Sequence, residues 1–128
     1  MFYVEGIIDS IELDFKGPKL KRFSLIPAPE FLVAEPNGTK RVLLLDYYSG
    51  DDCRMNVASL VKGDKNENDK EVLFFKPHDS WTPALIDILI QAKCTHSKVR
   101  VCISRMKSKR KDAISYPNLE GVIEVHLI

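Results

Sequence analysis

The residues with the clearest capacity for chemistry are five cations in one short run, RMKSKRK, at positions 105–111. Seven residues that hold five positive charges cannot pack into a core, so the run predicts a solvated loop. Cations of this kind bind phosphate groups, and a nearby aromatic ring can stack on a nucleic-acid base. The predicted ligand-binding residues here are Arg105, Lys107, Lys109, Arg110, Lys111 and Tyr116. The alternative is a loop whose charges only keep the protein soluble.

Two pairs of neighbouring aromatic residues, Tyr47-Tyr48 and Phe74-Phe75, lie in segments that are predicted to be strands. Side chains that follow one another in a strand point to opposite faces, so one member of each pair should lie outside the core. An outside ring can stack on a base or a sugar. We include Tyr48 in the predicted ligand-binding set. Alternatively, these rings belong to the core or to a contact between subunits.

Residue types that carry out catalysis or bind metals form no known pattern in this sequence. The spacings between the histidines and cysteines match neither a metal site nor a nucleophile–base pair. These residues are His78, His96, His126, Cys53, Cys94 and Cys102. We expect surface histidines, and buried thiols at Cys94 and Cys102. Asp51 and Asp52 fit a turn. We therefore predict no catalytic residue, no metal site, no cofactor and no enzymatic activity.

The composition is that of one globular domain, residues 1–128. The net charge is +1, so no overall field attracts nucleic acid or an anionic membrane. An odd number of cysteines, three, favours a reducing compartment. The first residues do not resemble a signal peptide, and no run reaches the roughly 18 apolar residues of a membrane span. We expect a cytoplasmic protein, or a secreted one if the sequence is a mature fragment.

The elements that must position these residues are organised around a predicted helix at about residues 80–95. Asp79 or Ser80 can cap this helix, and Pro83 falls in its first turn. Its apolar residues recur at helical spacing and form a wide stripe; they are Leu85, Ile86, Ile88, Leu89, Ile90 and Ala92. A helix that is apolar over most of its circumference should be buried on several sides.

Strands are predicted before and after this helix, at residues 2–15, 41–48, 71–76, 98–104 and 119–128. In the first strand, Gly6 marks a bulge or a close backbone approach. One face of that strand should carry Tyr3, Ile7, Ile11, Leu13 and Phe15. Residues 19–31 should be irregular because Pro27 and Pro29 lack backbone donors. Residues 54–61 fit a short strand or a helical turn, and residues 63–69 fit a solvated loop.

This order of elements predicts a mainly β fold with one long helix. A closed barrel whose end is covered by the helix is an economical way to bury the helix. We therefore expect an OB-fold-like barrel of five strands, with its core helix at about residues 80–95 between the third and fourth main strands. In such a barrel the connection between the fourth and fifth strands borders the ligand face, and the basic run 105–111 lies in that connection.

The stretch from Glu71 to Ser104, EVLFFKPHDSWTPALIDILIQAKCTHSKVRVCIS, resembles a strand–helix–strand segment of small bacterial OB-fold proteins. That group is related to the pentameric B subunits of bacterial toxins. The matching residues are Pro77, Asp79, Ala84, Leu85, Leu89, Ala92, Lys93, Lys98, Val99, Arg100 and Val101. The resemblance implies an OB-fold in an oligomeric module that recognises a glycan or a protein. The basic run and the lack of a signal peptide depart from that group.

Two functions remain open, and neither is enzymatic. The first is a cytoplasmic domain that binds single-stranded nucleic acid, in which the basic run supplies charge and a tyrosine stacks on bases. The second is a homo-oligomeric module for glycan or protein recognition, as the resemblance implies. The basic run favours the first function, and the helix–strand motif favours the second. We prefer nucleic acid as the predicted ligand.

Overall fold

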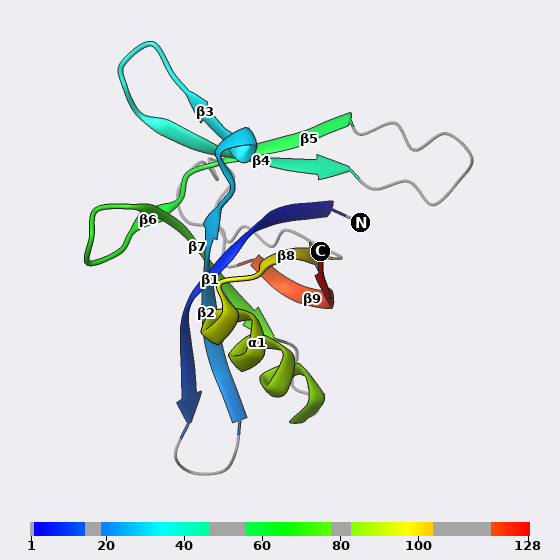
Figure 1. The fold of residues 1–128 in the computed structure, drawn as a ribbon. Helices are drawn as coiled ribbons and strands as arrows, with labels where there is room; N and C mark the ends of the chain where they lie inside the picture. Colours follow the sequence, from blue (N-terminus) through cyan, green and yellow to red (C-terminus); the bar gives the residue numbers. More distant parts are fainter. Residues whose placement is uncertain (1, 15–18, 47–55, 78–82, 104–118) are drawn as a thin grey trace.

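The computed structural model describes residues 2–14, 19–46, 56–77, 83–103 and 119–128 (Figure 1). The elements in chain order are β1 (Phe2–Asp14), β2 (Lys19–Pro27), the 3₁₀-helix η1 (Pro29–Phe31), β3 (Leu32–Ala34), β4 (Lys40–Asp46), β5 (Asn56–Val61), β6 (Asp64–Lys65), β7 (Glu71–Pro77), α1 (Pro83–Thr95), β8 (Lys98–Ile103) and β9 (Leu119–Leu127). Over these residues the chain is mainly β and has one α-helix, which confirms the predicted class.

The described strands number nine and form one open sheet, so the barrel of five strands stays a prediction. β1 pairs antiparallel with β2 and β8, β2 pairs antiparallel with β7, and β8 with β9, whereas β7 and β9 are parallel. These pairings lead from β1 through β2, β7, β9 and β8 back to β1. β4 also joins β1, and β3 and β5 pair only with β4 within the described strands. The sheet is therefore open at β3 and β5.

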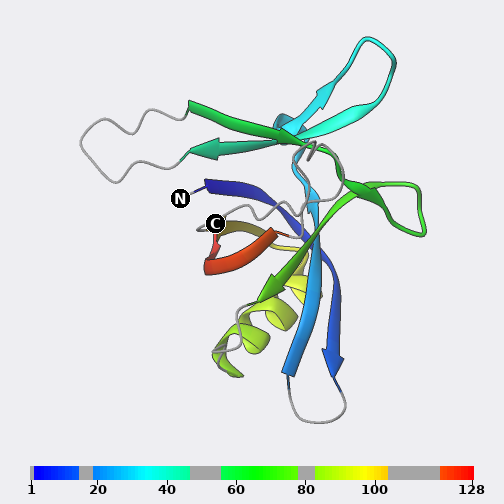
Figure 2. The same cartoon turned by 180° about the vertical axis from the view of Figure 1, so that it is seen from behind.

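The strands β3, β4 and β5 lie at one end of the molecule and α1 lies at the other, as the two opposite views show (Figures 1 and 2). β4 meets only the start of β1, where Phe2 is opposite Asp46 and Tyr3 is opposite Leu45. Beyond these two pairs, β1 continues between β2 and β8 toward the helix. β1 therefore connects the two ends of the molecule.

The faces of β1 differ from the predicted ones. Val4 and Ile8 are buried in the core, whereas Ile7 and Leu13 are 38% and 44% exposed. Ile7 lies between Val4 and Ile8 on the outward side and lines the pocket, and a bulge between Ile8 and Ser10 then shifts the alternation, so that Ile11 packs against the same core as Val4 and Ile8. Tyr3 lies on the opposite face from Val4 and is buried as well, because Phe31 of η1 packs on its ring.

The described part of the helix α1 runs from Pro83 to Thr95 and is buried on one side only, whereas the predicted caps, Asp79 and Ser80, lie outside the described residues. Leu85, Leu89 and Ala92 belong to the core, and Ile90 is 44% exposed. The expectation of burial on several sides is therefore wrong, because α1 packs mainly against β1 and to a smaller extent β9. Within the described residues, no helix has both the length and the apolar character needed to cross a membrane.

Residues 19–31 are more regular than predicted. The first part of this stretch forms β2, which pairs with β1 and β7. Its residues Phe23 and Leu25 are fully buried. Pro27 is the last residue of β2 and Pro29 begins η1, so neither proline removes a donor from the middle of the strand. Residues 56–61 form a strand rather than a helical turn, and β6 is a two-residue strand inside the predicted loop.

Candidate functional site

The seven residues predicted to bind a ligand lie outside the described part of the chain; they are Tyr48, Arg105, Lys107, Lys109, Arg110, Lys111 and Tyr116. Six of them belong to the segment 104–118, which joins the antiparallel neighbours β8 and β9. Three other features of the described surface are suited to binding. They are a pocket beside β1, a stacked arginine and phenylalanine on β2 and β7, and a group of metal-binding residue types on β8 and β9.

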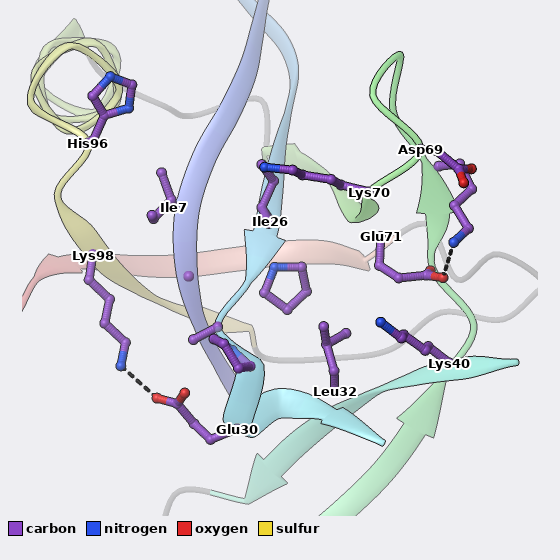
Figure 3. Close-up of a pocket in the computed structure, with 15 residues that line it drawn as sticks. Ile7, Ile26, Glu30, Leu32, Lys40, Asp69, Lys70, Glu71, His96 and Lys98 are labelled. Atoms are coloured by element: carbon purple, nitrogen blue, oxygen red, sulfur yellow. Dashed lines mark hydrogen bonds and ion pairs between the residues drawn. The ribbon is translucent and has the colours of Figure 1, made fainter. Parts of the chain in front are cut away.

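The pocket has a volume of about 530 Å³ and lies where β1, the end of β2, η1 and the start of β7 meet (Figure 3). Its floor is apolar and consists of Ile7, Ile26, Pro27, Pro29 and Leu32. A volume of this size falls within the range of pockets that hold a small molecule. The pocket can therefore accept an apolar group of that size, such as one ring system of a larger ligand.

The shape of the pocket depends on a close approach of β1 and β2 at Gly6. Gly6 is opposite Pro27, and a Cβ atom at position 6 would overlap the carbonyl oxygen of Ile26. The Ala28 N–H still donates to the Glu5 carbonyl oxygen of β1 at 2.9 Å, and η1 begins at the next residue, Pro29. The predicted close backbone approach at Gly6 is confirmed.

Charged side chains surround this floor, and two of the lysines are paired. Lys98 Nζ lies 2.7 Å from Glu30 Oε1, and Lys65 Nζ lies 2.7 Å from Glu71 Oε1. The hydrogen bond between Lys98 and Glu30 raises the pKa of the lysine and lowers the pKa of the carboxyl. The hydrogen bond to Glu71 likewise raises the pKa of Lys65. Lys98, Glu30 and Lys65 therefore remain charged at neutral pH.

Two further lysines of the rim, Lys40 and Lys70, are exposed and form no ion pair with any other described residue. They come from β4 and from the turn before β7, so they lie on the side of the pocket that faces β7 (Figure 3). An ammonium group without an ion-pair partner can bind an anionic group of a ligand at little cost. The pocket thus combines an apolar floor with available positive charge.

His96 lines the pocket from the end of α1. Its φ of 51° places it in the left-handed region, where the helix stops. The Ser97 N–H donates to the Ala92 carbonyl oxygen at 3.0 Å, and the His96 N–H donates to the Lys93 carbonyl oxygen at 3.3 Å. These bonds fix the helix end and therefore the backbone of His96 beside the pocket. It is exposed, as predicted for a surface histidine.

The second feature is Phe74 on the outer face of β7, with the guanidinium of Arg22 from β2 stacked 4.5 Å above the ring centroid. Arg22 Nε also lies 2.8 Å from Glu12 Oε1 of β1. The neighbouring Phe75 points the other way and stacks on Phe23 in the core, with ring centroids 5.1 Å apart. The predicted division of Phe74 and Phe75 between two faces is confirmed, and Phe74 is partly exposed.

The third feature brings together Cys102, Glu124 and His126, whose ligand atoms all lie within 4.8 Å of one another. Sequence spacing gave no signal for this group, because the cross-strand register of β8 and β9 creates it: Cys102 is opposite Glu124. Cys102 is buried as predicted, whereas Cys94 is exposed on α1, so the prediction of a core thiol there is wrong. Neither Cys94 nor Cys102 forms a disulfide, and Cys53 lies outside the described residues.

Comparison of the chain with protein-family models, with curated proteins and with solved structures gave no match. The resemblance to toxin B subunits therefore stays a prediction. Among the described residues that line the pocket there is no serine, threonine or cysteine. An apolar floor beside exposed lysines can bind a ligand that has both an apolar part and an anionic part.

Proposed function

We propose that this protein is a non-catalytic binding module that acts in the cytoplasm and binds single-stranded nucleic acid. The observation that carries the proposal is the pocket, whose apolar floor lies beside Lys40 and Lys70. A nucleotide has the matching chemistry, because an apolar base face is joined to an anionic phosphate. The basic run 105–111, with Tyr116 and Tyr48, would extend the contact along the strand.

The strand pairings support an OB-like arrangement for this module. In our proposal β1, β2, β7, β8 and β9 are the five strands of a barrel, since their pairings form a ring and β7 and β9 are parallel. α1 then lies between the third and fourth of these strands, and β3–β6 are an insertion between the second and third. Phe74 and Arg22 lie on the outer face of the second and third strands, the face that binds ligands in OB-folds.

Fluorescence titration of a labelled single-stranded oligonucleotide at several salt concentrations tests the proposal. Each phosphate contact should add about −0.7 to the slope of log K against log salt. Three to five contacts give a slope of about −2 to −3.5 by the same relation. Replacing Lys40 and Lys70 by glutamine should reduce the magnitude of this slope by about 1.4 if each lysine contacts one phosphate. Replacing the five cations of 105–111 by serine should flatten it further.

The matched control is Lys93→Gln, which removes one exposed charge from α1 at a position that does not line the pocket. This change should leave the salt dependence unaltered. Phe74→Ala should weaken binding by roughly 1–3 kcal/mol if a base stacks on the ring, without altering the slope. Absence of binding at low salt, or an equal effect of Lys93→Gln and the pocket variants, would contradict the proposal.

A second candidate function is self-assembly into a recognition module for a glycan or a protein. It is favoured by the two open strands of the described sheet, β3 and β5, which carry the exposed residues Val33 and Leu60. Open strands with apolar side chains are templates for pairing with another chain. If this candidate is right, the protein should be oligomeric in light scattering, and Leu60→Lys should shift it toward the monomer.

The control for that experiment is Leu13→Lys, because Leu13 and Leu60 have nearly equal exposure, 44% and 46%, and Leu13 lies on β1 instead of an open strand. Leu13→Lys should leave the oligomer intact. A protein that is monomeric at every concentration tested argues against the second candidate.

A further inference from the structure

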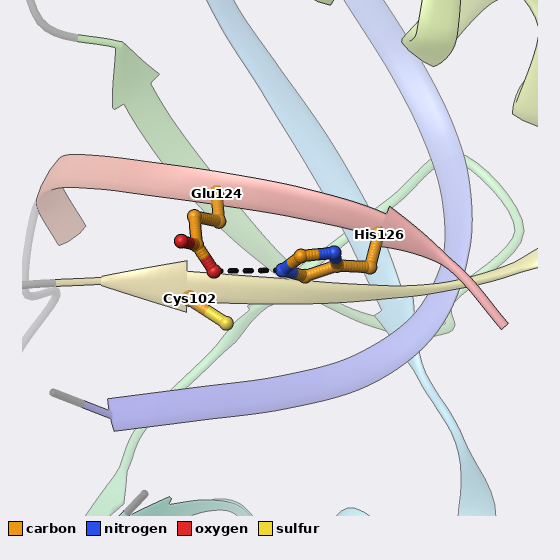
Figure 4. A group of neighbouring side chains, drawn as sticks. All are labelled: Cys102, Glu124 and His126. Carbon is orange, nitrogen blue, oxygen red and sulfur yellow. Dashed lines mark hydrogen bonds and ion pairs between the residues drawn. The ribbon is translucent and has the colours of Figure 1, made fainter. Parts of the chain in front are cut away.

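Three side chains of different chemistry meet on one face of β8 and β9 (Figure 4). Cys102 of β8 is opposite Glu124 of β9 in the antiparallel register, and His126 follows two residues later. Residues two apart in a strand point to the same side, so the carboxylate and the imidazole both face the strand that carries the thiol. The His126 Nε2 atom lies 2.7 Å from Glu124 Oε2, and all three ligand atoms are within 4.8 Å of one another.

We propose that Cys102, Glu124 and His126 bind a zinc ion. Thiolate sulfur, imidazole nitrogen and carboxylate oxygen are the three kinds of protein ligand that zinc accepts. In a tetrahedral site with bonds of 2.0–2.3 Å, ligand atoms are roughly 3.3–3.7 Å apart. The present separations are 2.7 Å between His126 Nε2 and Glu124 Oε2 and at most 4.8 Å for the other pairs, and the two side chains that must adjust, Glu124 and His126, are exposed and can rotate.

The charges around the group also suit a divalent cation. The carboxylate and a thiolate together carry two negative charges, which balance the charge of zinc. The nearest cation on β8, Arg100, is opposite His126, but its Nε and Nη2 atoms both lie 2.8 Å from Glu5 Oε2. Its guanidinium also stacks 4.7 Å above the Tyr3 ring. Glu5 therefore offsets the positive charge that would otherwise oppose the ion.

The thiol is held in place for this role. Cys102 is 2% exposed, and Tyr3 is its partner on the other side, in β1. Burial and, to a smaller extent, the charge of Glu124 raise the pKa of Cys102 to about 11, so without a metal the sulfur is protonated and a poor nucleophile. When zinc binds, this proton is released to water and the thiolate becomes the ligand. The fourth position of the ion would face solvent, because Glu124 and His126 do.

The test uses protein without a histidine tag, reduced with a phosphine, and Co²⁺ as a spectroscopic probe for the zinc site. Wild-type protein should bind one Co²⁺ and show a sulfur-to-metal charge-transfer band, and one equivalent of Zn²⁺ should abolish the band. Cys102→Ser should remove it. His126→Gln and Glu124→Gln should weaken Zn²⁺ binding by at least about 10- to 100-fold, the loss that even an outer-shell change typically causes.

Two matched controls separate this site from other thiols and imidazoles of the chain. Cys94→Ser and His96→Asn alter exposed residues that are not part of the group, so both variants should keep the band and the affinity. Because His126 is exposed, His126→Gln should fold like wild type, and the same concentration of Zn²⁺ should raise the melting temperature of wild type by more than that of this variant. A wild-type protein with no Co²⁺ band, or a band that persists in Cys102→Ser, would overturn the proposal.

Discussion

Leu89→Ala is expected to lower the free energy of unfolding by about 2–5 kcal/mol. Leu89 is fully buried and lies in the middle of the face of α1 that meets the described core. Removing its branched end deletes apolar contacts and leaves a cavity that neighbouring strands cannot fill, because β1 is held by β2 and β8. Urea denaturation of the wild type and of Leu89→Ala, followed by far-ultraviolet circular dichroism, measures the difference in their free energies of unfolding.

The neighbouring residue supplies the control. Ile90 is 44% exposed on the same helix, so Ile90→Ala removes an apolar side chain that is already largely in water. We expect a loss below about 1 kcal/mol for that change, as for most surface substitutions. Equal losses for Leu89→Ala and Ile90→Ala would show that α1 does not pack on the strands through the Leu85, Leu89 and Ala92 face.

Gly6→Ala is expected to destabilise the protein by at least about 3 kcal/mol, at the upper end of the range for overpacked sites. A Cβ atom at this position would overlap the carbonyl oxygen of Ile26 and lie 2.9 Å from both the carbonyl carbon of Ile26 and the Cα of Pro27. These are backbone atoms of the paired strand, so they cannot move aside as a flexible side chain can. β1 and β2 must separate locally, and the pocket floor at Ile26 and Pro27 moves with them.

A second glycine gives the matched comparison. Gly38 has a φ of +85° and nothing near its would-be Cβ, so Gly38→Ala meets strain of the backbone but no collision. Its expected cost is about 1–2 kcal/mol. Thermal and urea unfolding of both variants decide the matter: a Gly6→Ala protein as stable as Gly38→Ala is incompatible with the close approach of β1 and β2.

Much of the fold could be predicted from local patterns. The helix was predictable because Pro83 fits its first turn and Leu85, Leu89 and Ala92 recur at helical spacing. The close approach at Gly6 was predictable because a glycine inside an apolar strand commonly marks a bulge or a place where another backbone comes near. In contrast, the faces of β1 were not, since Val4 and Ile8 face the core while Ile7 lines the pocket, and the bulge between Ile8 and Ser10 leaves no mark in the alternation of apolar residues.

The errors have a common origin in long-range pairing. Two prolines argued against a strand at residues 19–27, yet a proline at a strand end costs no ladder hydrogen bond, and only the pairing shows where the strand ends. The group of Cys102, Glu124 and His126 depends on the register between β8 and β9, which are separated by segment 104–118. The pocket likewise depends on η1 folding back onto Tyr3. No local spacing encodes these contacts.

The pairing of β1 with β8 has a consequence for how the chain folds during synthesis. Phe2 is opposite Ile103, so the two halves of this ladder are 103 − 2 = 101 residues apart in sequence. Ribosomes add about 5–20 residues per second, so β8, which pairs with one edge of β1, is synthesised roughly 5–20 s after β1. Such non-local contacts also slow folding after release. We therefore expect the nascent chain to leave the β8 side of Val4 unpaired for seconds, because its partner Val101 is made late, and this unpaired strand edge is a site at which other chains can add.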